Sequence, residues 1–158
     1  MTSRVEPVSS TAPSAPDAAL WPRPAALPVD EFSAFCSEYF RHVPEEELAG
    51  LGPRDRADRA ASHLEFGWRR DPGEHLLRVI TPSPERDGWD AGGFTLVQLV
   101  TDDRPFLVDS FSMVLSQQGW SLRRLFHPQL GVRRAANGSF EGLGANAGKA
   151  VPESWMAM

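Results

Sequence analysis

The sequence has a single cysteine, Cys36, among its 158 residues, which excludes an intramolecular disulfide. One thiol also fits a reducing compartment, so we expect the chain in the cytoplasm. No apolar run approaches the ~20 residues that a membrane-spanning helix needs. No apolar segment follows Arg4 to form a secretory signal. The sequence therefore predicts neither a membrane partner nor export.

Basic residues are in the minority as well. Lys and Arg together number 16 against 21 Asp and Glu, which gives a formal net charge of −5 at pH 7. Binding of nucleic-acid phosphates needs a clustered basic face, so this balance argues against a nucleic-acid partner. The arginine pairs at 69–70, 123–124 and 133–134 are expected on solvated edges, with an anion site as the alternative.

Residues that commonly carry catalysis are sparse. The four histidines, His42, His63, His75 and His127, stand at no metal-ligand spacing from one another or from Cys36. We therefore expect surface or core histidines and no metal site. Cys36 lies on the apolar stripe of an expected helix, which predicts a core thiol and not a nucleophile.

The segment GLGANAGK at 142–149 invites a phosphate-loop interpretation, which fails at two positions. Leu143 stands where the motif needs its first glycine, and Ala150 replaces the Ser or Thr that binds magnesium. The segment also lacks the glycine spacing and the βαβ frame of a dinucleotide site. We therefore expect no cofactor to be bound by this chain.

Composition and periodicity divide the chain into three parts. Residues 1–28 are rich in Pro, Ala and Ser and have no periodicity, which predicts a disordered and dispensable arm. Residues 29–72 place apolar side chains such as Phe32 and Phe35 at helical spacing, which predicts a helical segment. Residues 73–158 mix strand and helix patterns, which predicts an α/β domain.

The expected elements of this third part follow one another closely. They are a strand over 75–81, a polar loop over 83–93, a strand over 94–101, a helix over 105–118, a strand over 120–134, a hairpin turn at 137–138, a loop over 141–152, and a strand over 153–158 that has only just begun when the chain stops. The strand over 94–101 is apolar on both faces, so we expect it to be central and most buried. Leu107, Phe111 and Val114 should pack over it.

The turn after this strand is the one candidate ligand site. The free N–H groups at the start of the following helix are able to bind the carboxylate of a small ligand, with Asp102, Asp103, Arg104 and Phe106 as the candidate ligand-binding residues. Alternatively, the aspartates cap the helix and complement its dipole. No residue is a candidate for catalysis.

The run DRPFLV at 103–108 resembles the strand-to-helix turn of ACT domains, which often reads Asp-Arg-Pro-Gly followed by aliphatic residues. More specifically, the run TDDRPFLVDS at 101–110 resembles the extreme N-terminus of the large bacterial NAD-specific glutamate dehydrogenases. Phe-Arg-His-Val at 40–43, His-Pro at 127–128 and Glu-Ser-Trp-Met at 153–156 support the resemblance. It extends from about Asp30 to Met156.

The resemblance implies an α+β fold with an ACT-like (ferredoxin-like βαββαβ) sheet, incomplete at the C-terminus and preceded by a small helical segment. The strand from Ser154 should lie between the strands over 94–101 and 120–134 and leave part of that slot unfilled. Unpaired strand edges recruit other chains, so we expect a marginally stable chain that tends to associate.

The resemblance also implies a function. The chain would be the N-terminal regulatory or assembly module of an NAD-dependent glutamate dehydrogenase, which converts glutamate to 2-oxoglutarate and ammonia. As a fragment without the catalytic domain it would be inactive alone, and NAD would bind elsewhere in the full-length enzyme. Its partners would be the rest of the dehydrogenase chain or other subunits, with an amino-acid effector as a further candidate.

Phe106 stands where ligand-binding ACT domains commonly have Gly, which lets a ligand approach the backbone. A phenylalanine at this position favours a packing or assembly role for the turn. The alternative function is a stand-alone ACT-type regulatory module that binds an amino acid.

Overall fold

The computed structural model describes residues 27–144 and 150–158. Most of the arm expected over 1–28, and part of the glycine-rich segment at 142–149, therefore lie outside the described residues. Leu27 belonged to the expected arm, but it is buried in the core beside the start of the first helix. The arm prediction is thus wrong for this residue.

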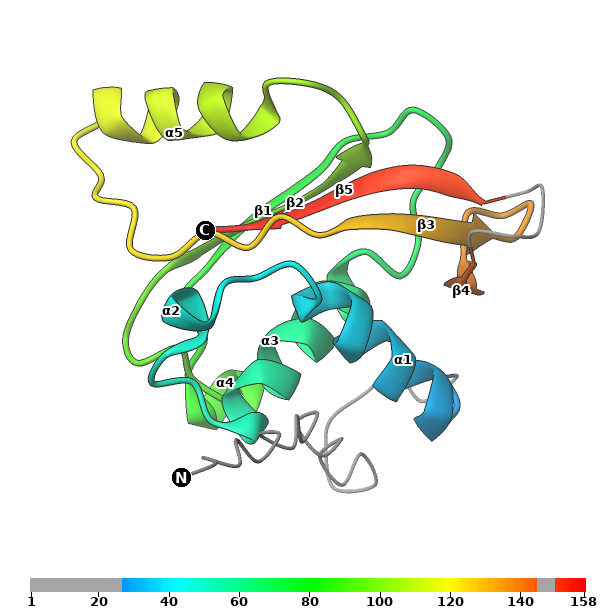
Figure 1. Ribbon diagram of the computed structural model, residues 1–158, viewed down its shortest axis with the longest axis horizontal. Helices are drawn as coiled ribbons and strands as arrows, with labels where there is room; N and C mark the ends of the chain where they lie inside the picture. The colour runs from blue at the N-terminus through cyan, green and yellow to red at the C-terminus, as the bar shows by residue number, and fades with distance from the viewer. Residues whose placement is uncertain (1–26, 145–149) are drawn as a thin grey trace, which may run out of the picture.

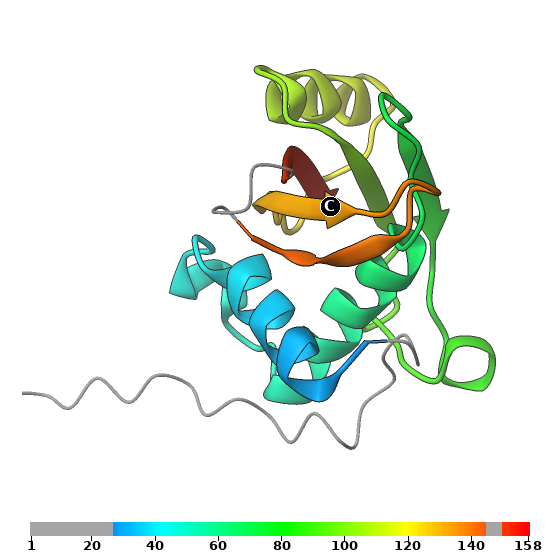
Figure 2. The same ribbon diagram turned by 90° about the vertical axis from the view of Figure 1, so that its right-hand side faces the viewer.

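The described residues form an α+β, ACT-like structure in which a five-stranded antiparallel sheet carries helices on both faces (Figure 1). The elements are α1 (Val29–Phe40), α2 (Glu45–Leu48), α3 (Pro53–Phe66), β1 (Leu76–Ile80), α4 (Pro84–Asp87), β2 (Leu96–Asp102), α5 (Leu107–Gln117), β3 (Gln129–Arg134), β4 (Phe140–Leu143) and β5 (Val151–Ala157). The helices α1, α2 and α3 lie on one side of the sheet, and α5 lies alone on the other (Figure 2).

The last strand in the chain lies at the centre of the sheet, whose order is β1-β2-β5-β3-β4. β5 pairs with β2 from Gln98–Ala157 to Asp102–Glu153, and with β3 from Gln129–Ser154 to Val132–Val151. The expected position of this strand is thus confirmed. The prediction that part of the slot between β2 and β3 stays unfilled is wrong, because β5 begins at Val151 and pairs with both strands. In addition, β1 pairs with the other edge of β2.

Several boundaries differ from the expected ones. Pro128 precedes β3, and residues 120–128 run without regular pairing except for one bridge from Phe126 to Ala157, so the long strand expected over 120–134 is short. β4 and the start of β5 occupy the loop expected over 141–152, and α4 occupies part of the polar loop at 83–93. The turn at 137–138 is confirmed, with the Gly138 N–H donating to the Ala135 carbonyl at 2.9 Å.

The main hydrophobic core lies between the sheet and the helical segment. Phe35 of α1 is fully buried, and its ring centroid is 5.5 Å from that of Trp155 on β5 and 5.9 Å from that of Phe140 on β4. Gly67 leaves room for the Trp155 ring, since a Cβ there would stand 2.4 Å from it. The helical segment and the sheet therefore share one core, and the division at residue 72 stays a prediction.

A buried histidine ties the helices to the sheet. The Leu99 carbonyl of β2 is only an acceptor, so His63 Nε2 donates to it at 3.2 Å, and Nδ1 accepts from the Tyr39 hydroxyl at 2.7 Å. Burial lowers the pKa of His63 to about 3. The side chain is therefore a neutral core histidine that joins α1, α3 and β2.

The opposite face of the sheet is less well covered. Leu99, Met156 and Met158 form its buried floor, but none of the side chains on α5 is fully buried. Phe111 is half-buried and Val114 is 51% exposed, so the expectation that Val114 packs over β2 is wrong. On β1, Leu77 and Val79 point to this same face, opposite Leu99 and Val97, and both are exposed.

The two faces should differ in their contribution to stability. We expect Phe35→Ala to lower the free energy of unfolding by about 3–5 kcal/mol, because it empties the closed core. Phe111→Ala should cost about half as much, because part of its ring already contacts water. Urea unfolding monitored by circular dichroism checks both, and an equal loss for the two variants would contradict the burial difference.

The buried histidine should make stability depend on pH. Its folded pKa of about 3 lies below the unfolded value of about 6.5, so only the unfolded state gains the proton as the pH falls between them. The free energy of unfolding should therefore fall from about pH 6.5 downward, by at most about 1.4 kcal/mol per unit from this group. In His63→Gln this part of the slope should disappear. His42→Gln, at an exposed position, should keep the wild-type slope.

Candidate functional site

The predicted turn residues lie together after β2, but their carboxylates are already engaged. Asp102 ends β2 and pairs with the Arg70 guanidinium, whose hydrogen bond lowers the pKa of the Asp102 carboxyl. Asp103 accepts from the Ser154 hydroxyl at 2.6 Å and from Gln129 Nε2 at 3.1 Å. Its own N–H donates to the Pro152 carbonyl at 3.0 Å. Both aspartates therefore fasten the end of β2 to neighbouring segments.

Neither aspartate caps the helix. The N-cap of α5 is Phe106, and no side chain hydrogen-bonds to the cap. The capping interpretation is thus wrong, because Arg104 and Pro105 separate the aspartates from the first turn. Ligand binding by Asp102, Asp103, Arg104 and Phe106 stays a prediction.

Behind the turn lies a buried ionic cluster that the sequence analysis missed. Glu153 of β5 is fully buried and accepts from Arg70 Nη1 at 2.8 Å, from Arg134 Nε at 2.7 Å and from Trp155 Nε1 at 2.9 Å. With Asp102, the cluster holds two arginines and two carboxylates and is neutral in sum. Buried charges are stable only when paired in this way.

Two arginines of this cluster were expected on solvated edges, and that expectation is wrong. Arg70 is buried and the Arg134 side chain is only 9% exposed, because each binds Glu153 and backbone carbonyls, including those of Glu74 and Gly138. The sequence separation between Arg70 and Glu153 explains why the cluster was missed. Its local signal is an acidic residue inside a mostly apolar strand.

Phe106 is the unusual residue of the turn. It has φ 65° and ψ 12°, and among the described residues it is the one non-glycine residue with positive φ. This left-handed conformation costs about 1–2 kcal/mol for a residue with a side chain. The ring is 74% exposed, so it fills no space in the fold. Arg104 beside it is exposed as well.

The turn does not fit NAD. A dinucleotide site needs glycines at the strand-to-helix turn so that the pyrophosphate can reach the helix N-terminus. Residues 102–106 contain no glycine, and their two carboxylates would repel a pyrophosphate.

Burial raises the pKa of the Cys36 thiol to about 12, so this thiol stays protonated and packs against the core.

Within 27–144 and 150–158, no three His, Cys, Asp or Glu side chains gather in a way that would hold a metal ion. Over the same ranges, no helix has the length and apolarity needed to cross a membrane.

The ionic cluster should depend on its central carboxylate. Glu153→Gln should lower the free energy of unfolding by about 3–5 kcal/mol, because Arg70 and Arg134 stay buried with one charge too few between them. The control is Glu38→Gln, which removes the exposed pair between Glu38 and Arg41 and should cost less than about 1 kcal/mol. Denaturant titration of both variants checks this. Equal small losses would contradict a buried, fully paired cluster.

Comparison with known proteins places the chain in a family. Residues 35–158 match the family described as "Glutamate dehydrogenase, ACT1 domain". The chain is 32% identical over 116 residues to the NAD-specific glutamate dehydrogenase of Pseudomonas aeruginosa, and 30% identical over 104 residues to that of Halomonas elongata. These alignments cover 73% and 66% of this chain.

The chain is much shorter than these relatives, since the alignments span 7% and 6% of their lengths. No solved structure matches it significantly. The family match covers β1 to β5 and most of the helical segment, including the turn and the ionic cluster. The chain therefore belongs to the glutamate dehydrogenase ACT1 domain family.

Proposed function

We propose that this domain is the N-terminal regulatory or assembly module of an NAD-dependent glutamate dehydrogenase. The conversion of glutamate to 2-oxoglutarate and ammonia, and the binding of NAD, would then need parts of the enzyme outside this domain. Family membership supports this proposal, as does the absence of a dinucleotide turn after β2. The partners would be the rest of the dehydrogenase chain or other subunits.

The observation that carries the assembly role is the exposed Phe106. A strained backbone conformation persists only where the surrounding structure fixes it, and such strain clusters at functional sites. Here the strain holds an aromatic ring in water, where it stabilises nothing within the domain. Aromatic side chains are enriched at protein interfaces, so the ring is suited to a partner's surface.

Other exposed apolar side chains lie on the same side of the sheet. On α5, Met113 and Val114 are 57% and 51% exposed, and on β1 Leu77 and Val79 add to them. Apolar surface of this kind marks protein interaction sites. An amino-acid effector at the turn is less well supported, because Asp102 and Asp103 are already bound within the fold.

The test replaces Phe106 by glycine in the complete dehydrogenase polypeptide that carries this domain. Glycine adopts positive φ freely, so we expect the isolated 158-residue chain to keep or gain up to about 1 kcal/mol of stability. The complete enzyme should nevertheless dissociate at concentrations at which the wild type stays assembled, as followed by sedimentation velocity.

Val29→Gly serves as the control, because Val29 is also exposed but begins α1 on the opposite side of the sheet. The Val29→Gly enzyme should assemble like the wild type. The isolated wild-type chain should also form no NADH from glutamate and NAD. Normal assembly of the Phe106→Gly enzyme would contradict the role of this turn in assembly. NADH formation by the isolated chain would contradict the proposal that catalysis needs parts of the enzyme outside this domain.

A further inference from the structure

The face of the sheet that carries α5 is only partly covered. Neighbouring strands lie about 4.8 Å apart, so five strands make a face about 20 Å wide, whereas one helix covers about 10 Å. In the described part of the chain, α5 is the one helix on this side (Figure 2). The part over β1 stays in water, since Leu77 and Val79 are 57% and 62% exposed.

One flank of α5 faces this uncovered part. Leu107, Phe111 and Val114 follow one another at i, i+4 and i+7 and form a row along the helix. β2 and β3 are parallel, because each pairs antiparallel with β5, and parallel strands joined through a helix make a right-handed crossover. In this hand the row lies on the β1 side of α5. We call the exposed side chains of Leu77, Val79 and Val114 the open face.

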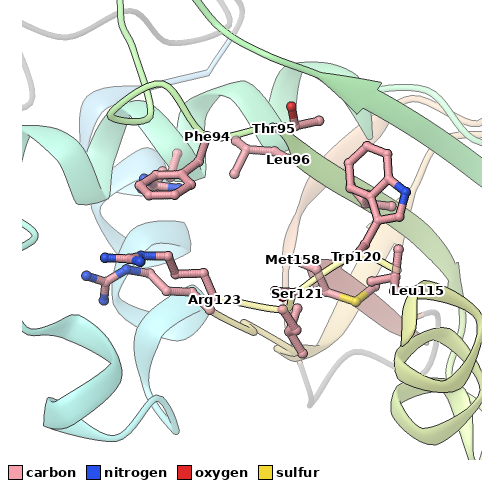
Figure 3. A pocket seen from close by; sticks show the side chains of 12 residues that line it. Phe94, Thr95, Leu96, Leu115, Trp120, Ser121, Arg123 and Met158 are labelled. Atoms are coloured by element: carbon pink, nitrogen blue, oxygen red, sulfur yellow. The ribbon is translucent and has the colours of Figure 1, made fainter. Parts of the chain in front are cut away.

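The open face is as long as the elements that border it. The five residues of β1 extend over about 16 Å, and so do the eleven residues of α5. Figure 3 shows the ring of Phe94 at the start of β2 and that of Trp120 near the end of α5. Both rings are about half exposed, so the apolar surface continues to this end of the sheet.

A helix covers such a face better than a strand. A strand added to the edge of β1 would lie in the plane of the sheet and leave Leu77 and Val79 in water. A helix that lies on the sheet beside α5 covers both side chains and packs against Val114 as well. It needs an apolar row at i, i+4 and i+7 toward the sheet and a polar opposite side.

A second copy of this domain has no such helix among its described residues. α2 and α4 are single turns. The exposed positions of α3 are Pro53 and charged residues, and α1 and α5 each expose only two apolar side chains at positions that form no row. By contrast, the alignments span only 7% and 6% of the two dehydrogenases, so most of such a polypeptide lies outside this domain. A helix tethered in the same polypeptide has a high effective concentration at the open face.

We propose that the open face docks an amphipathic helix of about eleven residues, supplied by the same dehydrogenase polypeptide from outside this domain. Its apolar row lies on Leu77 and Val79 and against Val114. The inference rests on the proposed function in one respect, which is that the domain is part of a longer dehydrogenase. It does not involve Phe106, which stands at the N-terminal end of α5.

The experiment places the photoreactive residue 4-benzoylphenylalanine at position 79 of the complete dehydrogenase and, separately, at position 114. After irradiation, mass spectrometry identifies the linked peptides. We expect both positions to link to one segment outside this domain, at residues three or four apart, in a product with the mass of a single polypeptide. The same residue at position 29, on the opposite side of the sheet, should not link to that segment.

Other products would overturn the proposal. They are a link to any part of residues 1–158, a product of doubled mass, links at every second residue as in a strand, or no link from either position. Each of these outcomes leaves the sedimentation of the Phe106→Gly enzyme unaffected. Failure of this inference is therefore distinguishable from failure of the assembly role.

Val79→Asp tests the apolar contact itself. In the isolated 158-residue chain position 79 is exposed, so the melting temperature should change by less than about 2 °C. In the complete enzyme the carboxylate would be covered by the helix, and the yield of the link from position 114 should fall at least about fivefold. Val29→Asp is the matched control and should keep the wild-type yield. An unchanged yield in Val79→Asp, or an equal loss in Val29→Asp, would overturn the proposal.

Discussion

The fold depends on a buried charge at the centre of its sheet. Glu153 lies on β5, the strand that both halves of the sheet share, and it is bound by Arg70 from before β1 and by Arg134 from the end of β3. Removing a carboxylate from water is costly unless every acceptor position is used. The cluster therefore fixes the register of β5, because a slip by one residue would turn Glu153 to the other face and leave both arginines unpaired.

This arrangement separates two tasks within the turn at 102–106, which are to hold the fold together and to present an exposed surface. Asp102 and Asp103 belong to the framework, since one completes the arginine cluster and the other binds Ser154 and Gln129. Arg104 and Phe106 face outward and hold nothing in place. Within five residues, the chain changes from side chains that bind within the fold to side chains that are exposed to solvent.

The sequence predicted the elements with strong local patterns. The stripe of Phe32 and Phe35, the apolar run of β2 and the glycine turn at Gly138 each depend on neighbours in the sequence, and all three were found. The central place of β5 came from the family resemblance. Its length was underestimated, because Pro152 and the glycine-rich segment before it are typical of loops.

Features made by distant residues could not be predicted in this way. Arg70 and Glu153 meet only after the sheet has formed, and nothing local distinguishes them from surface charges. The same holds for Arg59 of α3, which comes near Arg123 and Arg124 only across the fold. The pair at 123–124 was recognised, with an anion site as its alternative, but the partner from α3 was not. Polar sites of this kind can be predicted only when the topology of the fold is known.

The central position of β5 has a consequence for the synthesis of the chain. A ribosome releases β1 to β4 before residues 151–157 emerge, yet β2 and β3 have no direct pairing with each other and are joined only through β5. Until that strand arrives, the nascent chain holds two separate hairpins, each with an open edge and an apolar face. Such edges invite pairing with other chains. β5, the strand of this sheet that is made last, is thus the one that ends the period in which the nascent domain needs protection.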